Sequence, residues 1–129
     1  AAPGAVDRLL AGTGSRLDAE GTALYARLVR SPGHVRGALA MMAGWDLRAL
    51  ARDLPRLRSP LLLLAGESDR TVPPAESERV HALVAGSRLR RFPGLGHLMH
   101  EERPGPFVEA IRDFVRETTA GGGPGRERA

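Results

Sequence analysis

The chain has 129 residues, which fits one small domain, and it contains no cysteine, so disulfide bonds and thiolate metal sites are excluded. Its formal net charge is +4, and all 19 cationic residues are arginines, spread along the chain without a basic face lined by stacking aromatics, which argues against nucleic-acid binding. The longest apolar run, Leu61 to Ala65, is far too short to span a bilayer, and no signal-peptide pattern is present, so we expect a cytoplasmic protein without a transmembrane segment.

The first 55 residues carry helical patterns and no strand signal. Ser15 is predicted to cap one helix, with Asp18 in the capping-box position, and Asp46 is predicted to cap another. Pro32 suits the first helical position after Ser31. The expected helices cover residues 5–11, 15–29, 32–42 and 47–54.

The pattern changes after Pro60 to strand, helix, strand, helix. The apolar run Leu61–Ala65 indicates a strand buried on both faces, as in a parallel sheet. Residues 73–85 predict a helix, residues 87–92 a more charged strand, and Pro106 the start of a last helix, whereas residues 120–129 are Gly-rich and predicted to be disordered. Two parallel strands are too few for a stable sheet, so we expect a fragment of a larger α/β fold.

Each predicted strand is followed by a loop with a catalytic type of side chain. Asp69 follows the first strand and His97 the second, 28 residues later. Since parallel strands bring such loops to one edge of the sheet, the two side chains are expected to meet there. A carboxylate beside a histidine fixes the imidazole tautomer and stabilises the imidazolium, which makes the histidine a general base.

Simpler interpretations exist for the same residues. Asp69 could be a carboxylate that stabilises the start of the helix that follows it, and His97 could be a hydrogen-bonded loop residue. Neither Ser15 nor Ser68 lies in a G-x-S-x-G motif, so neither is expected to be a nucleophile. His100 lacks the helical spacing of a metal site, and we expect no metal and no cofactor.

Two segments resemble the α/β-hydrolase superfamily. LLLLAGESDRTVPP is similar to its penultimate core strand and acid loop, and FPGLGHLMHEERPGPFVEAIRDFV is similar to its last strand, histidine loop and final helix. Together they cover residues 60–116. The resemblance implies the C-terminal part of an α/β-hydrolase fold, with Asp69 and His97 as catalytic residues.

The first half of the sequence resembles one particular group within this superfamily. AGTGSRLDAEGTALYARLVRSPGHVRGALAMMAGWDL is similar to the cap region of the magnesium-chelatase accessory α/β-hydrolases of bacteriochlorophyll synthesis. It implies a helical cap segment at 1–45 and the C-terminal part of the core at 46–119. It also implies a small-molecule substrate, with a porphyrin and magnesium chelatase as candidate partners.

The nucleophile elbow of the family is absent from this sequence, so the nucleophile, serine or aspartate, is expected upstream and the chain alone is expected to be inactive. A general cap-bearing esterase, an epoxide hydrolase or dehalogenase, and a non-catalytic porphyrin-binding scaffold remain alternatives. Candidate residues for the substrate pocket are Met41, Met42, Trp45, Leu98 and Met99.

Overall fold

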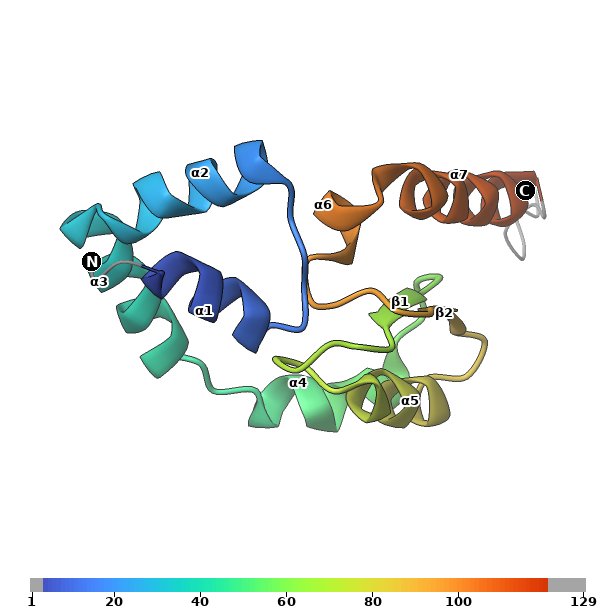
Figure 1. The fold of residues 1–129 in the computed structure, drawn as a ribbon. Coiled ribbons are helices and arrows are strands. Elements are labelled where there is room, and N and C mark those ends of the chain that lie inside the picture. The colour runs from blue at the N-terminus through green and yellow to red at the C-terminus, as the bar shows by residue number, and fades with distance from the viewer. Residues whose placement is uncertain (1–3, 121–129) are drawn as a thin grey trace, which may run out of the picture.

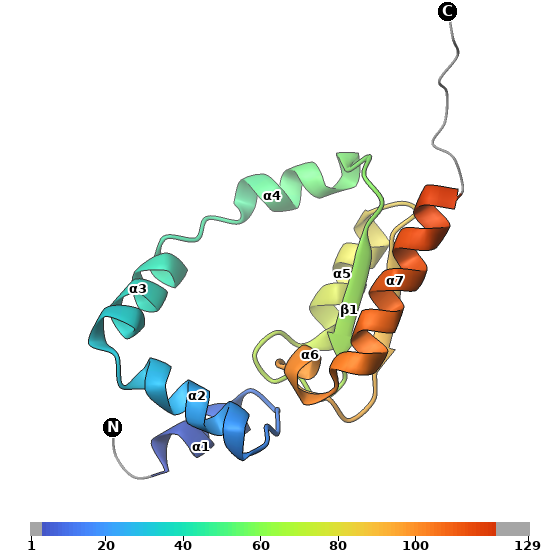
Figure 2. The same ribbon diagram turned by 90° about the horizontal axis from the view of Figure 1, so that it is seen from above.

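A computed structural model describes residues 4–120 of the chain. In both views, α1 to α4 follow an arc beside a compact unit that contains the two strands (Figures 1 and 2). The elements are α1 (Ala5–Gly12), α2 (Ala19–Val29), α3 (Pro32–Ala43), α4 (Arg48–Asp53), the 3-10 turn η1 (Leu54–Arg56), β1 (Leu62–Gly66), α5 (Pro74–Leu83), β2 (Arg88–Phe92), α6 (Met99–Glu102) and α7 (Pro104–Ala120).

The two strands pair in parallel, with Leu62 opposite Arg88 and Gly66 opposite Phe92. Helices α5 and α7 lie on opposite faces of the pair (Figures 1 and 2). The predicted strand–helix–strand–helix order is therefore confirmed. The expectation that the first strand is buried on both faces is wrong. Residues 62–64 are only half-buried, because β1 has a single neighbour within the described part of the chain.

A small apolar cluster joins α7 to β2 and the loop after it. Phe92, Leu95 and Ala110 are buried at its centre. The ring of Phe107 lies with its centroid 6.0 Å from that of Phe92. Phe114, one helical turn beyond Ala110, is half-buried, whereas Ile111 and Val115 on the same helix are exposed.

The start of α2 differs from the prediction. Asp18, not Ser15, is the N-cap: its Oδ1 accepts a hydrogen bond of 2.8 Å from the amide of Gly21. A capping side chain reaches the second or third residue of a helix, and only Asp18 lies at that distance from the first turn. Ser15 instead accepts a hydrogen bond from the amide of Leu98 and is buried, with 4% of its surface exposed.

Two other boundaries move for local reasons. Helix α4 begins at Arg48, and the Asp46 carboxylate binds both the amide and the guanidinium of Arg48. Helix α7 begins at Pro104 and not at Pro106, since both prolines fit the first turn, where amides have no helical acceptor. The predicted disordered tail lies outside the described residues, apart from Ala120, which ends α7.

The helices α2 to α4 bury little apolar surface. Their large apolar side chains include Leu39, 60% exposed, and Leu50, 57% exposed. No helix in residues 4–120 combines the length and the hydrophobicity needed to cross a bilayer.

The apolar cluster predicts an unequal effect of two truncations. Phe92→Ala should lower the free energy of unfolding by about 3–5 kcal/mol, because it removes a buried ring and leaves a cavity. Leu39→Ala is the control, since an exposed side chain should change stability by only about 0.5 kcal/mol. Urea denaturation followed by circular dichroism measures both, and equal effects would show that the cluster is not the core.

Candidate active site

The loops that follow β1 and β2 are joined by backbone hydrogen bonds. Glu67 donates its amide to the carbonyl of Phe92 at 3.1 Å, and Ser68 donates to Leu95 at 2.9 Å. A Cβ on Gly66 would lie 2.6 Å from the Leu95 carbonyl oxygen, so only glycine permits this approach. The parallel pairing thus continues past the strands and holds the two loops together.

Asp69 is held in one orientation by its own loop. Its Oδ1 accepts hydrogen bonds of 2.8 Å from the amides of Thr71 and Val72. These amides precede α5, whose N-cap is Pro73, so the carboxylate closes a turn and does not cap the helix. The side chain is 11% exposed, and its second oxygen, Oδ2, faces His97.

His97 meets that second oxygen. Its Nδ1 lies 2.8 Å from Asp69 Oδ2, which confirms the predicted approach of the two side chains. An ionised carboxylate can only accept, so Nδ1 carries the proton and Nε2 bears the lone pair. In the described part of the chain, Nε2 makes no hydrogen bond, and the imidazole is 37% exposed. The ring is therefore arranged to take a proton at Nε2.

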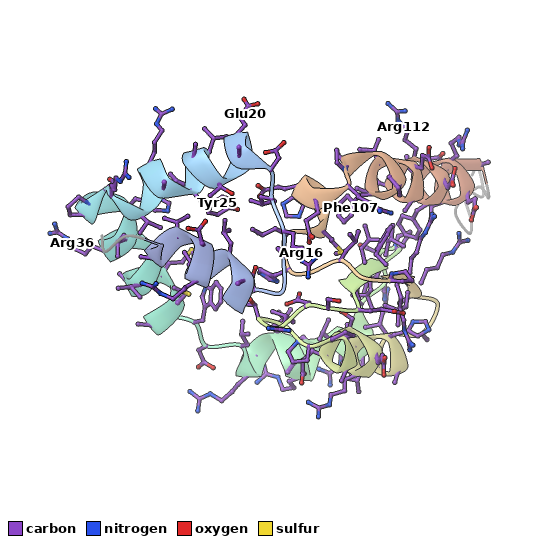
Figure 3. All side chains as sticks on the ribbon, in the orientation of Figure 1. Arg16, Glu20, Tyr25, Arg36, Phe107 and Arg112 are labelled. Atoms are coloured by element: carbon purple, nitrogen blue, oxygen red, sulfur yellow. The ribbon has the colours of Figure 1, made fainter. Side chains whose placement is uncertain are left out.

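The sequence did not single out three further groups at this site. The Thr13 carbonyl accepts from the amides of Arg70 and His97, each at 3.2 Å, and Ser15 Oγ accepts from the amide of Leu98 at 2.8 Å. Glu102 binds the amides of Gly96, at 2.7 Å, and Arg16, at 3.0 Å. Figure 3 labels Arg16 on the connection between α1 and α2, beside the strand-containing unit. Three of these contacts, Thr13–His97, Ser15–Leu98 and Arg16–Glu102, join residues more than 80 positions apart, so local patterns cannot reveal them.

The structure places the five candidate pocket residues in two separate regions. Leu98 and Met99 follow His97 directly, and Met99 packs on the apolar cluster. Met41, Met42 and Trp45 are 56%, 47% and 59% exposed. Helix α3 lies apart from α6 in both views, so the structure does not bring its methionines to His97 (Figures 1 and 2). A pocket role for all five remains a prediction.

His100 stays outside the acid–base pair. Its Nε2 lies 3.6 Å from Glu101, and its ring packs 5.8 Å from that of Phe107. Among residues 4–120, no group of three or more histidine, aspartate or glutamate side chains is arranged to hold a metal ion.

A second contact joins α2 to α6. The hydroxyl of Tyr25 donates to Glu101 Oε1 at 2.8 Å. Partial burial of the phenol, followed by the hydrogen bond to Glu101 and the negative charge of Glu101, raises the pKa of Tyr25 from 10.0 to about 12. Helix α6, which follows His97, is therefore bonded to α2 through Glu101 as well as to the connection between α1 and α2 through Glu102.

A family model described as "alpha/beta hydrolase fold" matches residues 5–104. The "Magnesium-chelatase 30 kDa subunit" of Rhodobacter capsulatus is 45% identical over 110 residues, which are 85% of this chain and 38% of that protein. The "Uncharacterized hydrolase YugF" of Bacillus subtilis is 41% identical over 49% of this chain and 23% of its own length. The chain thus spans less than two fifths of the length of both relatives.

A solved structure gives a weaker match. The "Alpha/beta hydrolase fold protein from Nakamurella multipartita" is 27% identical, with a TM-score of 0.49 over 91% of this chain and 47% of that one.

Tyr25 is the only tyrosine of the chain, so its ionisation can be followed by ultraviolet absorbance. We expect a midpoint near 12 in the unaltered protein and a lower midpoint in Glu101→Gln, which removes the charge but not the burial. Because folding raises this pKa, the associated stability is complete below pH 10 and is lost as the pH rises towards 12.

Glu109→Gln on α7 is the control and should leave the titration unchanged. A wild-type midpoint at the ordinary value of 10.0 would contradict the contact between Tyr25 and Glu101.

Proposed function

The chain belongs to the alpha/beta hydrolase fold family, and we propose that it supplies the acid, Asp69, and the base, His97, of a hydrolase triad. The observation that carries this proposal is the 2.8 Å contact between His97 Nδ1 and Asp69 Oδ2, with Nε2 left without a partner among the described residues. A partly buried, doubly hydrogen-bonded carboxylate next to a partly exposed imidazole is the arrangement that general-base catalysis requires.

The proposed chemistry follows from the two ring nitrogens. With a serine nucleophile, Nε2 of His97 takes the hydroxyl proton as the oxygen attacks a carbonyl centre, and the resulting imidazolium is stabilised by Asp69. The same proton passes to the leaving group, and Nε2 then deprotonates a water that hydrolyses the acyl intermediate. With an aspartate nucleophile, which has no proton to give, Nε2 acts only in this second step, on the water that hydrolyses the ester intermediate. The two amides that hold Oδ1 keep the Asp69 carboxylate in one orientation while the proton moves at Nε2.

The nucleophile has to come from outside these 129 residues, because the sequence contains no G-x-S-x-G elbow. We infer that another part of the whole protein provides it, with serine or aspartate as the candidates. Serine is the first candidate, because the G-x-S-x-G elbow of this fold presents a serine and the chain order acid then histidine matches that triad.

For the biological role, we propose an accessory protein of magnesium chelatase that acts on or holds a porphyrin during bacteriochlorophyll synthesis. The support is the 45% identity to a magnesium-chelatase subunit over 85% of the chain, a stretch too long to leave out the Asp69–His97 loops. The other candidate for the biological role is a general hydrolase, and the YugF match, which covers 49% of the chain, supports it.

A non-catalytic scaffold is the competing class of function. It would keep the porphyrin or the chelatase contacts without needing a proton acceptor at His97. The Asp69–His97 contact favours an enzyme. A protein that only binds a porphyrin or the chelatase does not need an imidazole with a fixed tautomer and an Nε2 without a partner among the described residues.

We predict unequal losses for the two catalytic residues in the whole protein, measured on any ester that it hydrolyses. His97→Ala should lower kcat by about 10⁶, and Asp69→Asn by about 10⁴, because asparagine leaves the geometry intact but favours the wrong tautomer. Thermal melts should change little, since both side chains lie on loops at the edge of the packed core.

His34→Ala is the matched control, because His34 is an exposed histidine on α3 and should keep full activity. Full turnover in His97→Ala would refute the triad. If that variant also supported magnesium insertion normally, the scaffold would be favoured.

A further inference from the structure

The turn formed by Thr13, Gly14 and Ser15 connects α1 to α2 and lies against both catalytic loops. One atom, the carbonyl oxygen of Thr13, accepts the amide of Arg70, next to the acid, and the amide of His97, the base itself. Both distances are 3.2 Å. A single backbone oxygen therefore fixes the spacing between the two loops.

Ser15 adds a second point of attachment. Its hydroxyl accepts the amide of Leu98 at 2.8 Å, and the residue is 4% exposed. Consecutive amides, those of His97 and Leu98, are thus both held by the turn. A buried amide that loses its acceptor is costly, so this contact resists rotation of the histidine backbone.

At Gly14 the turn lies so close to the acid loop that there is no room for a side chain. Its φ is +79°, and an added Cβ would lie 1.9 Å from the carbonyl oxygen of Ser68, the residue before the acid. An added Cβ on Gly96, the residue before the base, would lie 2.3 Å from the carbonyl carbon of Gly14. The backbone of the turn is therefore in close contact with the backbones of both loops. A side chain at Gly14 or Gly96 would force these segments apart.

We propose that the Thr13–Ser15 turn is a positioning element that sets the distance and orientation of the Asp69–His97 pair. Its hydrogen bonds to the two loops, among the described residues, are made with backbone amides and not with the imidazole or the carboxylate, so its residues act through the loops and are not catalytic. The catalytic role of the pair rests on the proposed function, whereas the control of the distance between the two loops does not. Through this turn, any movement of α1 and α2 is transmitted to the base.

The test reads the His97 ring directly. In the folded protein, a proton shared between Nδ1 and Asp69 gives a low-field proton NMR signal that exchanges slowly with water. Gly14→Ala should abolish this signal, and Ser15→Ala, which leaves the backbone conformation unstrained, should weaken it and speed its exchange. Where the whole protein hydrolyses an ester, Gly14→Ala should also lower kcat by about 10², the cost of a displacement of roughly 1 Å.

Gly86→Ala is the matched control. Gly86 has φ +76°, so an alanine there meets the same backbone strain, but an added Cβ has no atom within 4 Å. Its low-field signal should match that of the unaltered protein. If Gly14→Ala does not fold, Ser15→Ala alone decides the question.

An unchanged signal in folded Gly14→Ala, or in Ser15→Ala, would overturn the positioning role. The outcome is separable from the proposed function. If the signal is lost as expected but the whole protein hydrolyses nothing, the positioning role holds and the hydrolase proposal fails.

Discussion

The parallel pairing of β1 with β2 is the constraint on which the rest of the structure depends. It places Gly66 opposite Phe92, so both strands end at the same edge of the sheet. The loops that follow can then exchange backbone hydrogen bonds, and Asp69 reaches His97 without any distortion of the strands. An antiparallel pair would send the two loops to opposite ends and leave the histidine without a carboxylate.

The contact between Asp69 and His97 is supported by three parts of the structure. The acid loop orients Asp69 with two of its own amides. The apolar cluster of Phe92, Leu95 and Ala110 anchors the histidine loop on α7. The N-terminal helices contribute the third support, through the Thr13–Ser15 turn and the bond from Tyr25 to Glu101. The N-terminal helical segment is thereby connected to the loop and helix that follow His97.

The sequence predicted the parts that depend on local chemistry and chain order. Proline and glycine positions located most helices to within two residues, and the order of Asp69 and His97 after two strands predicted their contact. The functions of Ser15 and Glu102 could not be predicted, because GTGS is indistinguishable from an ordinary turn and because Leu98, bound by Ser15, and Arg16, bound by Glu102, lie more than 80 residues away. The half-burial of β1 also depends on neighbouring strands, which no pattern within Leu61–Ala65 can specify.

The central claim is that Asp69 fixes His97 in the tautomer of a general base. The most direct measurement is ¹⁵N NMR of the His97 imidazole at a pH where the ring is neutral. We predict a protonated Nδ1 and an unprotonated Nε2, with that preference lost in Asp69→Asn. A neutral ring protonated at Nε2 in the unaltered protein, or the same tautomer in Asp69→Asn, would contradict the claim.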